Sequence, residues 1–120
     1  FHYKGFCECI PIMLKDMYSE NVSDTIKSLI AENIRVIRSP AYIEDYLNLL
    51  SKEDLKDIRN PIIALVGDLK VEKALPLLIS ALNEGGNITT NALSSLGNFR
   101  KSELRIYFEK YLNHENKYYP

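Results

Sequence analysis

Apolar residues recur at helical spacing in seven segments, and these segments alternate between two kinds. The first kind carries apolar side chains at i, i+3, i+4 and i+7, the stripe of an amphipathic helix. The second kind spaces them at about i, i+4, i+8 and i+11, which also follows one face of a helix. Stripes of the first kind begin at Ile10, Ile43, Leu75 and Leu104, and stripes of the second kind begin at Ile26, Ile58 and Ile88. The pattern predicts an all-α chain in which two helix types alternate.

Capping and helix-breaking residues lie between these segments. Ser23 is suited to cap the second helix, because its side-chain oxygen can accept a free amide hydrogen of the first turn. Ser39–Pro40 marks the start of the third helix, since proline in a first turn loses no intrahelical hydrogen bond. Ser51 and Asp54 are capping candidates for the fourth helix, and Gly85–Gly86 is expected to end the fifth.

The two series of stripes share one period. Successive starts differ by 33, 32 and 29 positions in the first series and by 32 and 30 in the second. A common period in this range indicates an array of helix pairs, each burying its apolar face against its neighbours. We therefore expect one domain over residues 1–120, with repeats at about 10–38, 40–70 and 72–99 and a capping helix at 102–113.

Residue identities indicate which repeat class this is. Ile62–Leu69 reads Ile-Ile-Ala-Leu-Val-Gly-Asp-Leu, and Glu72–Leu82 reads Glu-Lys-Ala-Leu-Pro-Leu-Leu-Ile-Ser-Ala-Leu. Ala92–Gly97 repeats the first pattern as Ala-Leu-Ser-Ser-Leu-Gly. These segments resemble short bacterial HEAT-like repeats of the PBS-lyase type, whose inner helix ends in Ala-Leu-Gly and whose outer helix reads Ala-Leu-Pro-x-Leu-x-x-Ala-Leu. The resemblance implies a right-handed α-α superhelix, a solenoid of about three HEAT-like helix pairs plus a C-terminal capping helix.

The chain departs from that family pattern at two kinds of position. Arg35 stands where the family usually has glycine. Arg59 matches the usual arginine of the family, but Lys27 and Thr89 occupy the same place in the other repeats. A ladder of aspartate and arginine side chains between repeats is therefore expected to be incomplete.

Composition and charge argue against several classes of partner. The chain is 46% hydrophobic and 26% charged, which is close to the average of a soluble globular domain. Its 15 basic and 16 acidic residues leave a net charge of -1, whereas non-specific nucleic-acid binding depends on many lysine and arginine contacts to phosphate. No apolar run reaches the roughly 20 residues that span a bilayer. We expect a cytoplasmic protein with neither a nucleic-acid nor a membrane partner.

No motif in the sequence indicates catalysis. Cys7 and Cys9 are too close for an easy disulfide, and with His2 they are too few for a structural zinc site. No serine or cysteine stands in a nucleophile context such as Gly-x-Ser-x-Gly. The acidic residues at 53–57 are explained by the start of a helix, where the dipole favours negative charge. We therefore expect no catalytic, metal or cofactor site.

The resemblance places the inner helices along a concave face, and their residues outside the core are what a partner would meet. Ile63 and Leu93 flank this ridge and are expected to pack between neighbouring inner helices. We expect the partner to be another protein. The candidate partner-binding residues are Glu32, Arg35, Arg59, Asn60, Asn91 and Ser94, and Ala64 is a further position on the same face.

Two further functional interpretations stay open beside the binding module. The first is an enzyme, because HEAT-like repeats also occur in bilin lyases and alkylpurine DNA glycosylases. The second is a fragment or subunit of a larger scaffold. The binding module itself has one concrete form that the resemblance allows, a bacterial immunity protein that neutralises a toxin.

Overall fold

A computed structural model describes residues 9–52 and 58–116 of the chain, with side chains up to Tyr111 in the last helix. Within these residues every regular element is helical, which confirms the prediction of an all-α protein. None of the helices there is long and apolar enough to cross a membrane. The capping candidate Asp54 and the side chains of His2 and Cys7 lie outside the described residues.

Seven α-helices and three short 3-10 helices follow one another along the described chain. Helix α6 ends before the glycine pair that was expected to end it, and α7 begins two residues before Ile88, where its stripe starts. The other starts agree closely with the predicted segments. The α-helices are α2 (Ile10–Met17), α3 (Asp24–Ile37), α4 (Ile43–Leu50), α5 (Arg59–Asp68), α6 (Leu75–Ala81), α7 (Gly86–Gly97) and α8 (Arg105–Asn116). The 3-10 helices are η1 (Pro40–Tyr42), η3 (Glu72–Ala74) and η4 (Ser102–Leu104).

Two of the predicted caps are formed. The Ser23 side chain accepts a hydrogen bond from the backbone N–H of Ile26 at 3.3 Å, which satisfies a free donor at the start of α3. Ser39 accepts from the N–H of Ala41 at 3.3 Å and so begins η1, the turn that leads into α4. The carbonyl oxygen of Ser39 also accepts a 2.7 Å hydrogen bond from the buried hydroxyl of Tyr46. Ser39 therefore joins the start of η1 to the body of α4.

The same helix ending recurs three times. Arg38, Lys70 and Arg100 have φ angles of 56°, 53° and 52°, the left-handed region that non-glycine residues seldom adopt. They follow the last residues of α3, α5 and α7 by one, two and three positions, are spaced by 32 and then 30 positions, and each leads into a 3-10 helix. A left-handed residue commonly ends a helix, and a cation there is favoured by the helix dipole. The repeat period of the sequence is thus matched by a repeated backbone conformation.

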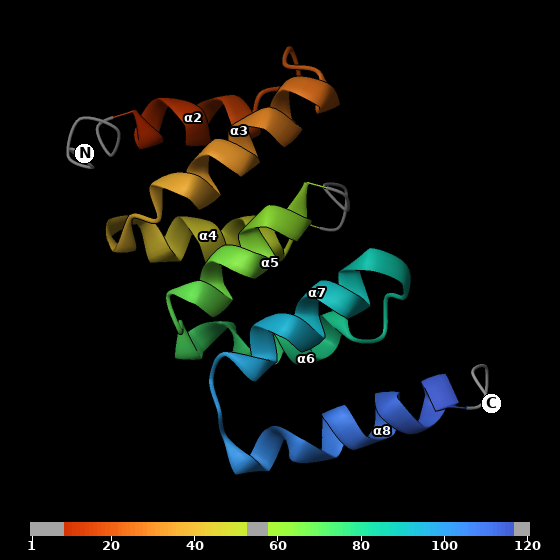
Figure 1. Cartoon of the computed structure of the whole chain (residues 1–120). Coiled ribbons are helices and arrows are strands. Elements are labelled where there is room, and N and C mark those ends of the chain that lie inside the picture. Colours follow the sequence, from red (N-terminus) through yellow and green to blue (C-terminus); the bar gives the residue numbers. More distant parts are fainter. Residues whose placement is uncertain (1–8, 53–57, 117–120) are drawn as a thin grey trace.

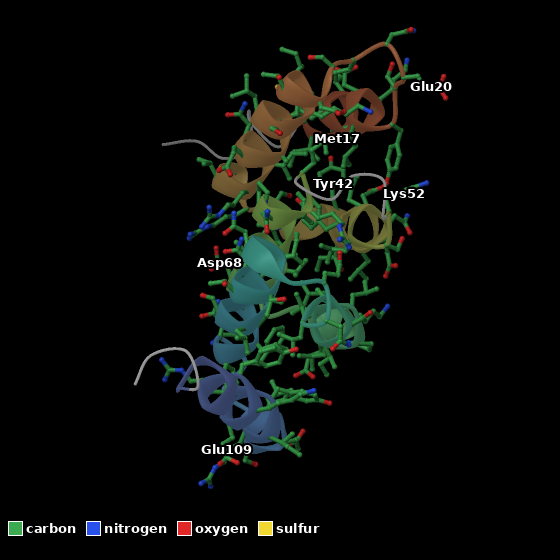
Figure 2. The ribbon with its side chains drawn as sticks, turned by 90° about the vertical axis from the view of Figure 1, so that its right-hand side faces the viewer. Met17, Glu20, Tyr42, Lys52, Asp68 and Glu109 are labelled. Atoms are coloured by element: carbon green, nitrogen blue, oxygen red, sulfur yellow. The ribbon has the colours of Figure 1, made fainter. Side chains whose placement is uncertain are left out.

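The helices form two rows, which we call inner and outer. Helices α3, α5 and α7 are the inner row, with α5 packed against α3 on one side and against α7 on the other. Helices α2, α4 and α6 are the outer row (Figure 1). Figure 2 shows the rows edge-on, with the inner helices to the left and the outer helices to the right. The molecule is elongated, with extents of 47 × 28 × 24 Å.

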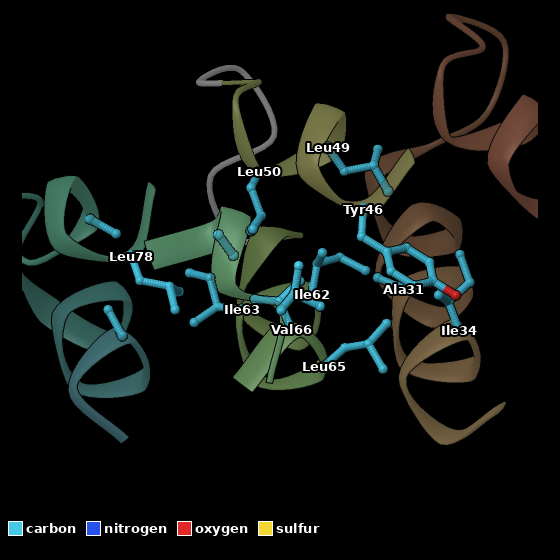
Figure 3. Packing of buried hydrophobic residues seen from close by; sticks show 14 of the residues in the cluster. Ala31, Ile34, Tyr46, Leu49, Leu50, Ile62, Ile63, Leu65, Val66 and Leu78 are labelled. Carbon is cyan, nitrogen blue, oxygen red and sulfur yellow. The ribbon is translucent and has the colours of Figure 1, made fainter. Parts of the chain in front are cut away.

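The hydrophobic core lies between the two rows, and α5 is at its centre. Seven of the ten residues of α5 are buried. In Figure 3 the side chains of Ile62, Ile63 and Val66 lie between Leu78 on one side and Tyr46 on the other. Because α5 packs against an inner helix on each side and against outer helix α4 behind it, its buried residues extend around most of the helix.

The core differs from the sequence prediction at one residue of α3. Ile34 and Ile37 of the predicted stripe are buried and Ile30 is half-buried, but Ile26 is 49% exposed. Its counterparts at the starts of α5 and α7, Ile58 and Ile88, are both buried. The expectation of a fully buried stripe on α3 was therefore wrong at its first position, because no described helix covers that side of α3.

Candidate partner-binding surface

The candidate site is the outward side of the inner row, which we call the inner-helix surface. It comprises one polar or small residue from each inner helix, Glu32, Ala64 and Ser94, together with Asn60 and Asn91. Glu32, Ala64 and Ser94 are spaced by 32 and 30 positions, the same spacing that separates the helix ends. Glu32 and Ser94 are exposed and Ala64 is half-buried. Packing of the inner helices therefore places side chains far apart in the sequence on one side of the molecule.

Two predicted residues meet across the contact between α5 and α7. The side-chain amide of Asn91 donates a 2.7 Å hydrogen bond to the Oδ1 atom of Asn60, and both residues are half-buried. Each amide thus satisfies part of the other's hydrogen-bonding capacity. A partner that reached this pair would meet a preformed polar group whose two side chains hold one another in place.

Beneath that pair, α5 and α7 approach so closely that their backbones nearly touch. The hydroxyl of Ser95 donates a 2.6 Å hydrogen bond to the carbonyl oxygen of Ile63. A Cβ atom on Gly67 would lie 2.6 to 2.8 Å from atoms of Ser95, closer than side chains tolerate. Glycine at this position is therefore required by the packing of the two helices. This contact also gives the inner-helix surface a rigid base.

Charged residues of the inner row are mostly paired with one another. Glu32 and Arg35, both predicted site residues, form an ion pair of 3.9 Å along α3. Arg38 pairs with Asp68 of α5 at 3.4 Å, which connects the ends of two inner helices. Because these side chains remain in contact with solvent, such pairs contribute little to stability. They leave the surface without a strong excess of either charge.

Arg59 does not belong to this surface, contrary to the prediction. Its side chain is 7% exposed, it donates from Nη1 to the carbonyl oxygen of Leu50 at 3.2 Å, and it forms an ion pair with Glu84 through Nη2. Leu50 is the last residue of α4, and Glu84 lies between α6 and α7. The guanidinium thus ties the start of α5 to two neighbouring segments. The prediction grouped Arg59 with the partner-binding residues of the inner helices, but here its side chain serves the fold.

Thr89 occupies the place of Arg59 in the next repeat and makes a comparable connection. Its hydroxyl donates to the carbonyl oxygen of Leu82 at 2.9 Å and accepts from the N–H of Gly85 at 2.8 Å. Leu82 follows α6 as Leu50 ends α4, so both side chains bind the end of the outer helix in their own pair. This position closes the second and third helix pairs, which explains why the side chains of Arg59 and Thr89 point away from the inner-helix surface.

Sequence reasoning missed a cleft at the C-terminal end of the inner row. The cleft has a volume of about 390 Å³ and an entrance open to solvent. The hydroxyl of Tyr111 in α8 donates a 2.7 Å hydrogen bond to the carbonyl oxygen of Leu82 at its edge. The sequence identifies Gly85 and Gly86 only as a helix stop, and nothing in the spacing indicates that Tyr111 of α8 borders a cleft at the start of α7. The residues that line the cleft are Leu82, Asn83, Gly85, Gly86, Thr89, Thr90, Leu93 and Tyr111.

A second feature that sequence reasoning missed is an exposed apolar stripe on α3. Besides Ile26, Leu29 is 57% and Val36 is 65% exposed. The three residues lie at i, i+3 and i+10, so they share one face of the helix. Sequence reasoning identified one apolar stripe on this helix, which begins at Ile26, and attributed it to the core. It did not consider that Leu29 and Val36 form a second stripe beside the first.

Two groups with altered pKa values lie away from the inner-helix surface. Burial, and then the negative charge of Asp45, raise the pKa of the Tyr18 hydroxyl next to α2. A hydrogen bond from Lys101 to Glu72, 2.7 Å long, raises the pKa of the Lys101 amine. Within residues 9–52 and 58–116 no cluster of three or more potential metal ligands is found.

Comparison with known proteins adds no relative to this description. No protein-family model matches the chain, and no curated protein or solved structure matches it either.

Proposed function

We propose that this chain is a protein-binding module and not an enzyme: a short right-handed α-α superhelix of about three HEAT-like helix pairs that recognises a partner protein through its concave inner-helix surface. The observation that carries the proposal is the alignment of Glu32, Ala64 and Ser94 on three neighbouring inner helices. One solvent-accessible position per repeat, carried on a packed core, provides an extended surface of the kind that helical arrays use for binding.

The side chains of this surface suit contact with a folded protein. Ala64 and Ser94 are small, so the backbone of a partner could approach α5 and α7 closely. The Asn60–Asn91 pair adds hydrogen-bonding groups that are already held in place, which lowers the entropy cost of binding. Near-balanced charge favours a partner surface of mixed polarity over a strongly charged polymer. A bacterial toxin neutralised by this chain is one partner that meets this description.

The test is a pair of matched substitutions on the two rows. Ser94→Arg places a long charged side chain on the inner-helix surface, and Ser80→Arg makes the same change on the exposed side of outer helix α6. The partner is first identified by its copurification with the full chain from the native cell, and binding is then measured calorimetrically with purified proteins. We expect Ser94→Arg to weaken binding by at least about tenfold, since one blocked contact costs on the order of 1.4 kcal/mol, while Ser80→Arg has no effect.

Both variants should melt at the temperature of the unaltered chain, because both serines are exposed. Equal binding by the two variants would show that the partner does not use the inner-helix surface. If only Ser80→Arg weakened binding, the partner would bind the outer row instead.

A further inference from the structure

The exposed stripe on α3 lies where the other inner helices contact the inner helix that precedes them. Positions of successive inner helices correspond at offsets of 32 and 30, the spacing of their helix-ending residues. Under this correspondence Leu29 matches Asn91 of α7, Asn33 matches Ser95, and Val36 matches Asp68 of α5. We call Ile26, Leu29, Asn33 and Val36 the α3 end face.

Each of these matching residues binds the preceding inner helix. Asn91 donates to Asn60 at 2.7 Å, and Ser95 donates to the carbonyl oxygen of Ile63 at 2.6 Å, so both join α7 to α5. Asp68 pairs with Arg38 at 3.4 Å and joins α5 to the end of α3. The position equivalent to the α3 end face is therefore an interhelical contact in both of the later inner helices.

Three of the four residues of the α3 end face are apolar although their side chains are exposed to solvent. Leu29 and Val36 replace Asn91 and Asp68, two polar residues that form bonds within the molecule. Both apolar replacements are more than half exposed, and Ile26 adds a third large aliphatic side chain. A cluster of apolar side chains on one face, bordered by polar residues, marks an interaction site more often than scattered exposed ones do.

From these observations we infer that the α3 end face is a docking site for one α-helix of another protein, which would extend the inner row by one helix. The bound helix would present apolar side chains to Leu29 and Val36. Opposite Asn33 it would carry a small residue, so that the asparagine amide could donate to a backbone carbonyl as Ser95 does to Ile63. The charges nearby are paired, Glu32 with Arg35 and Arg38 with Asp68, so the contacting face of the partner helix would be uncharged.

A second copy of this chain has no free inner-helix face with which to continue the inner row head to tail. The face of α3 that meets α5 and the face of α5 that meets α7 are both used inside the molecule. The corresponding face of α7 contains Gly97, where a Cβ atom would lie 3.9 Å from the Phe108 ring of α8. Helix α8 therefore covers part of the only inner-helix face in the described chain that could receive an α3 end face. This favours a helix from a different protein over a head-to-tail stack of copies of this chain.

The experiment uses the full chain and a synthetic amphipathic peptide of about 18 residues, long enough to populate a helix on contact. The peptide carries leucine at i, i+3 and i+7, alanine between them on the same face, and lysine and glutamate elsewhere. Methyl resonances of isoleucine, leucine and valine report where it binds. We expect shifts at Ile26, Leu29 and Val36, and we expect Leu29→Lys to weaken binding by at least about tenfold, because one large apolar contact is lost.

Ile12→Lys and Ile106→Lys are the matched controls, since these two isoleucines are 66% and 67% exposed but lie on α2 and α8. Both should bind the peptide within about twofold of the unaltered chain, as surface substitutions outside a contact do. Circular dichroism melting confirms that Leu29→Lys leaves the fold intact. Ser94→Arg should also bind the peptide with unchanged affinity. Partner binding through the inner-helix surface and peptide binding through the α3 end face are therefore tested by different variants.

Three results would overturn the inference. The first is an absence of methyl shifts on α3, or equal peptide binding by Leu29→Lys and the controls. The second is a dimer of the unaltered chain in sedimentation that Leu29→Lys converts to a monomer, which would make a second copy the occupant. The third is a set of nuclear Overhauser contacts from Leu29 and Val36 to other parts of the free monomer, which would make the chain itself the occupant.

Discussion

Gly67 of α5 lies so close to Ser95 of α7 that a Cβ atom on the glycine would come within 2.6 Å of the serine Oγ and 2.8 Å of its Cα. The Cα belongs to the backbone of α7, so no side-chain rotation relieves the contact. The same serine donates a 2.6 Å hydrogen bond to Ile63, one turn earlier on α5. The glycine therefore leaves room for the two inner helices to pack closely, and the serine hydroxyl forms a hydrogen bond across their contact.

Gly67→Ala should destabilise the chain by about 1–3 kcal/mol, because the added methyl group forces α5 and α7 apart. Gly97→Ala is the matched control at the corresponding position of α7, where the new Cβ would meet only the Phe108 ring at an ordinary 3.9 Å. That substitution should stabilise the chain by about 0.4–1 kcal/mol, through the lower entropy of the unfolded chain. Urea unfolding of both variants measures the difference. Equal effects at the two glycines would mean that α5 and α7 are not in close contact.

Ser95→Ala should cost about 1 kcal/mol, since the carbonyl oxygen of Ile63 keeps its helical bond but loses the hydroxyl. Combined with Gly67→Ala it should not restore stability, because the Cβ and Cα atoms of residue 95 remain 2.7 and 2.8 Å from the new methyl group. The free energies of unfolding of the two single variants and the double variant form a thermodynamic cycle. A double variant as stable as the unaltered chain would show that only the hydroxyl obstructs the methyl group.

Arg59→Leu should lower the free energy of unfolding by about 2–4 kcal/mol, because it removes a buried charged donor and leaves Glu84 and the Leu50 carbonyl without it. Arg105→Leu is the control, since Arg105 is 81% exposed and pairs with Glu109 along the same helix. Its effect should stay within about 0.5 kcal/mol. Thermal unfolding of the two variants decides the matter. If Arg59→Leu lost partner binding while its stability stayed unchanged, Arg59 would be a partner-binding residue and not a structural one.

The pKa of Tyr18 should fall when Asp45 is replaced by asparagine, because the carboxylate charge disfavours the phenolate. Absorbance of the phenolate, taken as the difference from a Tyr18→Phe variant, measures that titration. A raised pKa in the folded state means that the unfolded chain releases the proton first as pH rises. The contribution of Tyr18 to stability is therefore complete below its ordinary pKa of 10.0 and is lost as pH rises through the folded-state pKa. An unchanged titration in Asp45→Asn would leave burial as the sole cause of the shift.

The local structure could largely be predicted from short-range signals. Ser23 and Ser39 begin their helices as expected, because a capping hydrogen bond involves atoms only two or three residues apart. The period of about 30 residues was legible because each helix repeats an apolar stripe of fixed spacing. Which helices contact one another then followed in outline, since successive elements tend to be neighbours in space.

The candidate surface could be predicted only in part. Glu32 and Ser94 are exposed as expected, and Asn60 and Asn91 were assigned to one face, but their 2.7 Å hydrogen bond required the distance between α5 and α7. Arg59 was misplaced because a long side chain can turn back toward the end of the preceding helix, and its helical position does not reveal which way it turns.

The sequence by itself determined the helices, their order, two of their caps and the period at which they repeat, because apolar stripes and capping hydrogen bonds involve residues within a few turns of chain. Only the tertiary structure decided which faces are covered. Ile26 and Ile58 occupy the same position of the repeat, yet Ile58 is 5% exposed and Ile26 is 49% exposed. The physical reason is that burial requires a neighbouring helix: α5 has an inner helix on both sides, whereas α3 has one on a single side among the described residues. Periodicity identifies an apolar face, but only packing shows whether that face is core or a surface on which another protein can bind.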